Sequence, residues 1–227
     1  MLCLVTDRRR LAGPDVPFAR ARACLTAQAR HAAEAGVDLV QVRERDLPTA
    51  ELAAIVRDLV AVVRGTKTRV LVNDRLDVAL ACAAAGVQLR GDSVPVAAAR
   101  SLAPEGFVIG RSVHSVEEAR AASGADFLIA GTVFPTMSKA ESAPLLGVDG
   151  LQAIARVVPM PVLAIGGVTE MSVERIAPTG AAGCAAIGLF MRANGSSDGE
   201  LCRAIPLHGV VERVRRRFDN SENRSLT

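Results

Sequence analysis

The stretch Val162-Leu163-Ala164-Ile165-Gly166-Gly167 is an apolar run that stops abruptly on two glycines. Four other apolar runs also end on polar or small residues, at 39–44, 70–74, 108–114 and 129–134. A parallel strand that is buried on both faces is continuously hydrophobic, so its polar residues must gather at its ends. Polar groups at the carboxyl ends of strands, with helical segments between the strands, are typical of the active face of a (β/α)₈ barrel.

Bulk composition limits the class of protein. The chain has 227 residues, of which 50% are hydrophobic, with six Phe and neither Trp nor Tyr. This length suits one barrel domain with an aliphatic interior. The scarcity of aromatic residues argues against stacking on single-stranded nucleic acid, and the net charge of +3 is mild. We therefore expect no nucleic-acid partner, and we interpret the basic run at 8–10 as solvated surface.

Cysteine usage and hydropathy predict the compartment. The five cysteines are odd in number, widely spaced and without a C-x-x-C pair, which indicates reduced thiols rather than disulfides or a zinc site. No apolar run approaches the ~20 residues of a membrane span. The sequence thus predicts a soluble, cytoplasmic protein with no membrane partner. It leaves the oligomeric state open, a homo-oligomer included.

Periodicity predicts a single (β/α)₈ barrel over residues 1–218, followed by a polar tail over 219–227. The expected strands are 2–6, 39–43, 70–73, 86–89, 108–110, 127–131, 162–165 and 184–188. The expected helices are 18–35, 49–64, 76–85, 95–103, 115–123, 148–157, 170–178 and 198–217. A long irregular stretch, 135–147, is expected to lie over the active face, because loops of that length are commonly functional.

Glycine residues lie at the ends of two neighbouring strands. Gly166 and Gly167 follow the seventh expected strand, and Gly188 follows Ile187 in the eighth. In barrels these two loops commonly bind phosphate, because backbone amides can approach the anion there. Tight turns alone are the competing explanation. We expect a phosphate against the amides of Gly167 and Gly188.

Gln41, Arg43 and Arg45 alternate along the end of the second strand, so their side chains point to the same side. Two guanidiniums that face inward require an anionic partner. The alternative is that these arginines form surface salt bridges with Glu44 or Asp46.

Three further polar groups follow strand ends or lie in the long loop. Asp74, after Asn73, would hold a metal or orient an arginine, or it would cap the next helix. His114 follows the fifth strand, where an imidazole amid anion-binding groups suits general acid–base chemistry. Lys139 would close over a phosphate, or it would be a solvated loop lysine.

Five motifs taken together resemble the thiamine phosphate synthase/TenI superfamily, which has the (β/α)₈ fold. In chain order they are Gln41-Val42-Arg43-Glu44-Arg45-Asp46-Leu47, Val72-Asn73-Asp74-Arg75, Gly110-Arg111-Ser112-Val113-His114-Ser115, Gly131-Thr132-Val133-Phe134-Pro135-Thr136-Met137-Ser138-Lys139 and Ala164-Ile165-Gly166-Gly167. The set is specific, although each motif alone is not.

The resemblance implies substrate sites as well as a fold. The synthase joins an aminopyrimidine pyrophosphate to a thiazole phosphate with magnesium. By similarity, the pyrimidine pyrophosphate would be held by Gln41, Arg43, Arg45, Asn73, Ser112 and Lys139. The thiazole phosphate would be held by Thr136, Met137, Ser138, Gly167, Ile187 and Gly188.

The chain departs from the synthase pattern at several positions. Asp74 matches one magnesium ligand, but Ser93 stands where the second aspartate is expected, with Asp92 one residue away. Arg45 replaces a lysine, and Gly188 replaces a serine. Loss of one carboxylate should weaken Mg²⁺ binding, and a departing pyrophosphate would then lack its main charge stabiliser.

These departures favour the TenI branch, whose enzymes are thiazole tautomerases. We expect an isomerase that aromatises a carboxythiazole phosphate by proton transfer, with His114 as the catalytic residue and no metal or other cofactor. The alternative is a thiamine phosphate synthase, a transferase that uses Mg²⁺ through Asp74. A third hypothesis is a non-catalytic, ligand-binding regulator of the TenI type.

Overall fold

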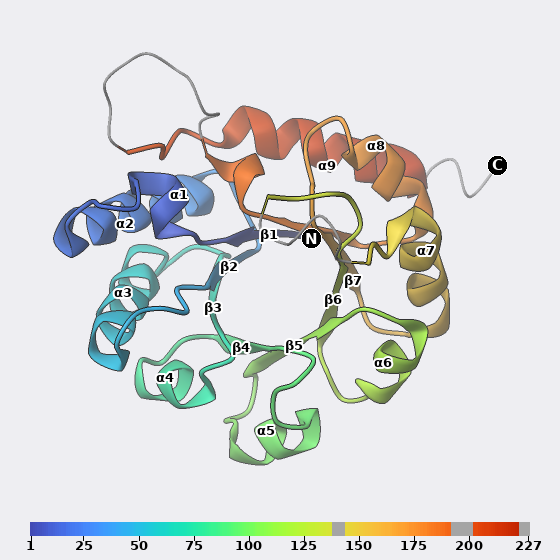
Figure 1. The fold of residues 1–227 in the computed structure, drawn as a ribbon, viewed down its shortest axis with the longest axis horizontal. Coiled ribbons are helices and arrows are strands. Elements are labelled where there is room, and N and C mark those ends of the chain that lie inside the picture. The colour runs from blue at the N-terminus through green and yellow to red at the C-terminus, as the bar shows by residue number, and fades with distance from the viewer. Residues whose placement is uncertain (138–143, 192–201, 223–227) are drawn as a thin grey trace.

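Eight parallel strands close into a barrel (Figure 1). The computed structural model describes residues 1–137, 144–191 and 202–222. The strands are β1 (Leu2–Val5), β2 (Leu39–Val42), β3 (Arg69–Asn73), β4 (Gly86–Leu89), β5 (Val108–Val113), β6 (Phe127–Gly131), β7 (Val162–Ile165) and β8 (Gly183–Ala186). Each strand pairs with the next, and β8 pairs with β1, so the predicted (β/α)₈ barrel is confirmed.

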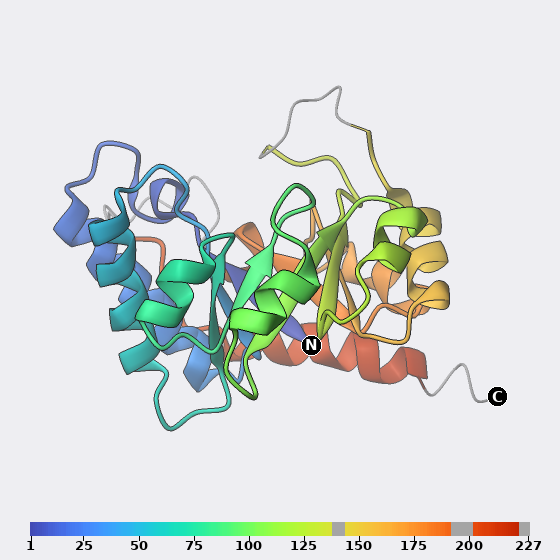
Figure 2. The same ribbon diagram turned by 90° about the horizontal axis from the view of Figure 1, so that it is seen from below.

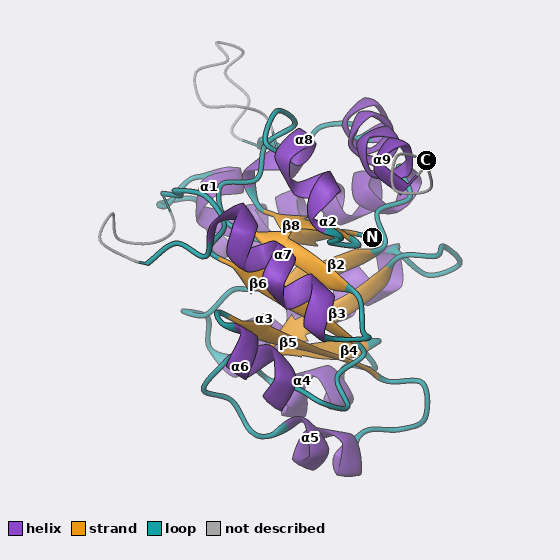
Figure 3. Ribbon diagram, turned by 90° about the vertical axis from the view of Figure 1, so that its right-hand side faces the viewer, coloured by secondary structure: helices purple, strands orange, loops and turns teal. Residues whose placement is uncertain are grey.

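Helices surround the strands (Figures 1 and 3). They are α1 (Arg8–Ala12), α2 (Phe18–Glu34), α3 (Thr49–Val62), α4 (Leu76–Ala81), α5 (Val96–Leu102), α6 (Val116–Ala121), α7 (Gly147–Val157), α8 (Val173–Ile176) and α9 (His208–Glu222), with short 3₁₀ turns η1 (Ala177–Thr179) and η2 (Gly188–Phe190). In the part of the chain that the structure describes, no helix is long and apolar enough to cross a membrane.

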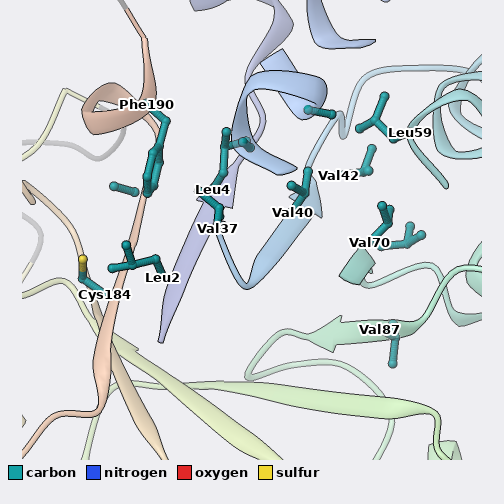
Figure 4. Close-up of a cluster of buried hydrophobic side chains, with 14 of the residues drawn as sticks. Leu2, Leu4, Val37, Val40, Val42, Leu59, Val70, Val87, Cys184 and Phe190 are labelled. Carbon is teal, nitrogen blue, oxygen red and sulfur yellow. The ribbon is translucent and has the colours of Figure 1, made fainter. Parts of the chain in front are cut away.

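Alternation along the strands produces two apolar layers. Leu2 and Leu4 of β1 face the helices and join the outer cluster shown in Figure 4, whereas Cys3 and Val5 belong to the cluster inside the barrel. The outer layer also takes residues from helices, such as Leu25 in α2. The interior is therefore a packed core, as expected for this fold.

One glycine makes room for the largest interior side chain. A Cβ added to Gly110 in β5 would lie 2.4 Å from the ring of Phe127 in β6. Phe127 is 1% exposed and fills the interior below the carboxyl ends of the strands. The interior at this level is therefore filled by side chains. Figure 2 shows the chain's N-terminus on the side opposite the loop that follows β6.

The structure corrects several predicted boundaries at the mouth. Helix α1 was not predicted; Asp7 caps it by accepting a hydrogen bond from the Arg10 N–H at 3.0 Å. Strand β5 continues to Val113, so the motif expected to follow it lies partly within it. The predicted helix 170–178 is divided between α8 and η1, and β8 is followed at once by η2.

The predicted last helix, 198–217, begins too early. α9 starts at His208, and residues 202–207 form no helix. Pro206 explains the difference, since proline and the residue before it resist a helix interior. α9 continues to Glu222 and so includes the first four residues assigned to the tail. Residues 192–201 and 223–227 lie outside the described residues.

Candidate active site

A pocket of about 1250 Å³ opens at the carboxyl ends of the strands. Its walls include the predicted catalytic and substrate-binding residues that the structure describes, namely Gln41, Arg43, Arg45, Asn73, Ser112, His114, Thr136, Met137, Gly167, Ile187 and Gly188, whereas Asp74 does not line it. Ser138 and Lys139 lie outside the described residues. Side chains from many strands therefore converge on one cavity, as predicted from the strand-end pattern.

One side of the pocket is cationic. Arg43 and Arg45 follow β2, and Arg90 follows β4. Burial, together with the neighbouring Arg45, lowers the pKa of the half-buried Arg43. Among the described residues, no carboxylate forms an ion pair with Arg43 or Arg45. This group of like charges is suited to an anion with several oxygens.

The alternative of salt bridges to Glu44 or Asp46 is wrong for these two arginines. Glu44 points away from the pocket and accepts hydrogen bonds from Thr6 Oγ1 at 2.7 Å and from the Arg8 backbone N–H at 3.0 Å. Arg8 also pairs with both Glu44 and Asp46. The acidic residues of the motif thus hold the β1–α1 connection, and the basic residues remain available to a ligand.

Asp74 lies beside the cationic side and contacts Ser93. The Ser93 hydroxyl donates to Asp74 Oδ1, and Arg90 Nη1 lies 3.6 Å from Asp74 Oδ2. Asp74 does not cap α4, whose first turn receives no side-chain hydrogen bond from its cap, so that alternative is wrong. The carboxylate of Asp92 is 70% exposed and pairs with Arg90 at 2.6 Å.

This donor set is compatible with magnesium. Mg²⁺ is commonly held by one or two carboxylates together with water and substrate phosphate oxygens. Asp74 supplies a carboxylate and Ser93 a hydroxyl in contact with it, next to the cationic side. No three His, Cys, Asp or Glu side chains converge on a metal site within residues 1–137, 144–191 and 202–222.

Neutral polar side chains also line the pocket, and a buried amide supports one of them. Gln41, 3% exposed, and Ser112 both line the cavity. Gln88 Nε2 donates to Ser112 Oγ at 3.1 Å, and Gln88 Oε1 is buried without a hydrogen-bond partner among the described residues. Gln88 was not among the predicted site residues; its position two residues after the inward-facing Gly86 is the signal that would have found it.

The opposite side of the pocket is built of backbone. Gly166 and Gly167 have φ of 100° and 62°, values that favour glycine. A Cβ at Gly167 would lie 2.5 Å from the Pro135 carbonyl oxygen, so the loop after β6 packs directly on this turn. Gly188 opens η2 at the end of β8. Side-chain-free backbone from two adjacent strands thus faces the pocket, as predicted.

His114 lies at the rim rather than in the interior. Its side chain is 49% exposed, and Nδ1 is 3.1 Å from Glu118 Oε2, which also accepts the His114 backbone N–H at 2.8 Å. The imidazole is therefore oriented by a carboxylate in the first turn of α6.

Comparisons with known proteins identify the relatives of this chain. Residues 2–190 match the family model described as "Thiamine monophosphate synthase". A thiamine-phosphate synthase of Methanoregula boonei is 44% identical over 161 residues, covering 70% of this chain and 74% of the relative. The thiamine-phosphate synthase of Pyrococcus furiosus is 39% identical over 194 residues, covering 85% of this chain and 87% of the relative.

A solved structure gives the same result. The chain matches a thiamine phosphate pyrophosphorylase from Pyrococcus furiosus with a TM-score of 0.75 and 34% identity, over 97% of this chain and 96% of that one. The resemblance to the superfamily is confirmed. The expectation of a thiazole tautomerase, an isomerase of the TenI branch, is wrong, because the relatives are named as synthases.

Proposed function

We propose that this chain, which belongs to the thiamine monophosphate synthase family, is a transferase that joins an aminopyrimidine pyrophosphate to a thiazole phosphate. The observation that supports this most strongly is the division of the pocket. Arg43 and Arg45, which form no ion pair with any described residue, lie on one side, and glycine backbone lies on the other. Two phosphorylated substrates can therefore be held at opposite walls with their reacting ends between them.

The cationic side would bind the pyrophosphate. Arg43 and Arg45 present guanidinium donors that match phosphate oxygens, with Arg90 beside them. Gln41, Asn73 and Ser112 would hold the pyrimidine through neutral hydrogen bonds. When the bond between the pyrimidine methylene carbon and the pyrophosphate oxygen breaks, negative charge grows on the pyrophosphate. Fixed positive charge at that position stabilises the transition state more than the ground state.

Magnesium is part of the proposal and would be held by Asp74 and Ser93. When bound, it would neutralise charge on the pyrophosphate oxygens. Arg90 lies close enough to Asp74 to interact with the same anion.

The glycine side would bind the thiazole phosphate. The amides at Gly167, Ile187 and Gly188 would approach the phosphate, with Thr136 as a further donor. The thiazole ring nitrogen then forms the new C–N bond as pyrophosphate leaves. Holding both reactants in one pocket converts their encounter into an effectively intramolecular step.

A coupling assay tests the proposal. Purified full-length protein is incubated with both substrates, with Mg²⁺ or with excess chelator, and products are identified by mass. We expect thiamine phosphate and pyrophosphate in equal amounts, formed only with Mg²⁺. The variant Arg43→Met should lose most turnover, whereas Arg22→Met, whose guanidinium pairs with Asp58 on α3 outside the pocket, should retain it. Absence of thiamine phosphate under all conditions would refute the proposed function.

A further inference from the structure

Three consecutive arginines in α1 have different environments. Arg8 pairs with Glu44 at 3.1 Å, and Arg9 pairs with Asp46 at 2.8 Å. Both carboxylates belong to the segment after β2, so these two guanidiniums are drawn toward that side of α1. The third arginine of the run, Arg10, is not part of this network.

Arg10 turns into the pocket. It is half-buried, lines the cavity, and has no ion-pair or side-chain hydrogen-bond partner within the described part of the chain. Its Nη2 lies 3.2 Å from the position that a Cβ would occupy at residue 188. The helix that carries it is held by the Asp7 cap on the Arg10 N–H. The guanidinium is therefore positioned against the end of β8.

Gly188 makes this approach feasible. Any side chain at 188 would begin within 3.2 Å of the guanidinium, closer than most Cβ contacts, and Arg10 would have to move. A half-buried guanidinium without an anion is costly, and a guanidinium beside exposed backbone amides is well suited to phosphate. Its contact with Gly188 places Arg10 on the glycine side of the pocket rather than with Arg43 and Arg45.

We propose that Arg10 binds the phosphate group of the thiazole substrate and selects the phosphorylated thiazole over its free alcohol. This inference rests on the proposed function. Backbone amides alone supply only partial charge, whereas Arg10 supplies a full charge and two parallel donors. The residue thus determines substrate specificity at the β8 end of the pocket.

Binding measurements on the full-length protein test the inference. Calorimetry with hydroxyethylthiazole phosphate should give a dissociation constant on the order of 10- to 100-fold higher for Arg10→Ala than for the parent, since hydrogen bonds to charged groups have that strength. Affinity for unphosphorylated hydroxyethylthiazole should not change. The dissociation constant of Arg10→Lys for the phosphate should lie between those of the parent and Arg10→Ala. Lysine keeps the positive charge but lacks the parallel N–H donors of a guanidinium.

The matched control is Arg9→Ala, which removes a guanidinium from the same helix but from the Asp46 side. It should leave both affinities unchanged. In the coupling assay, Arg10→Ala should raise KM for the thiazole phosphate and not for the pyrimidine pyrophosphate. The reverse pattern would overturn the inference and assign Arg10 to the pyrophosphate.

A double-mutant cycle tests the contact with residue 188. Gly188→Ala should weaken thiazole phosphate binding in the parent and much less in the Arg10→Ala background, because the displaced group is then absent. Additive losses would overturn the inference. Equal binding of the phosphate by the parent and Arg10→Ala would refute only the role of Arg10. A parent protein that binds no thiazole phosphate would refute the proposed function as well.

Discussion

The guanidinium of Arg111, within β5, donates to the carbonyl oxygen of Gly91 at 2.7 Å. The same side chain donates to the Val94 carbonyl at 2.9 Å and approaches the Ser93 carbonyl at 3.5 Å. Arg111 therefore holds the loop after β4 from the neighbouring strand. That loop carries Ser93, whose hydroxyl contacts Asp74. Arg111 is thus a positioning residue for the proposed magnesium site.

Arg111→Met should weaken magnesium binding on the order of 10-fold, because groups that orient metal ligands have effects of that size. Magnesium titration followed by calorimetry and by coupling rate measures the effect. Arg100→Met is the control, since Arg100 bonds to Phe107 O at 2.6 Å and to Asp126, remote from Asp74. Equal magnesium dependence in the two variants would contradict the positioning role.

Ser93→Asp should strengthen magnesium binding by about 10-fold, because Mg²⁺ affinity rises with the number of carboxylate ligands. Without Mg²⁺ the new carboxylate would repel Asp74, so the variant should melt at a lower temperature in chelator and recover when Mg²⁺ is added. Thermal unfolding and calorimetry provide readouts independent of activity.

Asp92→Asn is the comparison that decides between neighbouring residues. Asp92 is largely exposed and pairs with Arg90, so replacing its carboxylate with an amide should leave magnesium binding nearly unchanged. Loss of magnesium binding in Asp92→Asn, with no gain in Ser93→Asp, would identify Asp92 as the ligand instead.

His114→Asn should leave synthase turnover within a few-fold of the parent. The coupling reaction breaks a C–O bond and forms a C–N bond, and it delivers no proton to carbon. The imidazole is at the rim and paired with Glu118. Steady-state kinetics with both substrates measures the turnover of His114→Asn. Arg43→Met serves as the comparison, because it should lose most of its turnover. A loss of about 10²–10⁴-fold would instead indicate general acid–base catalysis by His114.

The fold was predictable because its signals are local. Apolar runs that end on polar residues marked the strands, and Gly167 and Gly188 marked a backbone-lined side of the pocket. Alternation grouped the side chains of Gln41, Arg43 and Arg45, and all three line the pocket, although β2 ends at Val42 and both arginines follow it. These inferences needed no contact between distant parts of the chain.

The roles of the arginines in α1 were not predictable from the local sequence. Arg8 and Arg9 are paired by Glu44 and Asp46, which lie 36 or more residues away in the chain. Arg10, which is not paired with either carboxylate, instead lies against Gly188.

The branch within the superfamily was also missed, because Ser93 was interpreted as the loss of a magnesium ligand. In the fold its hydroxyl lies against Asp74.

Glu44→Gln should change how stability depends on pH. Burial raises the pKa of Glu44, although hydrogen bonds from Thr6 and Arg8 oppose the shift. The folded state therefore binds this proton more tightly than the unfolded state does. As pH rises above the ordinary value of roughly 4.3, the unfolded state loses its proton first, and the contribution of Glu44 to stability falls until pH passes the folded pKa. The glutamine variant lacks this decline.

Urea unfolding at a series of acidic pH values measures how the contribution of Glu44 to stability depends on pH. The free energy of unfolding of the parent minus that of Glu44→Gln should decrease as pH rises through this window. Asp46→Asn provides a control of opposite sign, because hydrogen bonds from Arg8 lower the pKa of Asp46. Its contribution is present above the ordinary pKa and is lost as pH falls, so the corresponding difference should increase with pH. If both differences have the same slope, desolvation does not dominate at Glu44, and its bonds to Thr6 and Arg8 compensate for its burial.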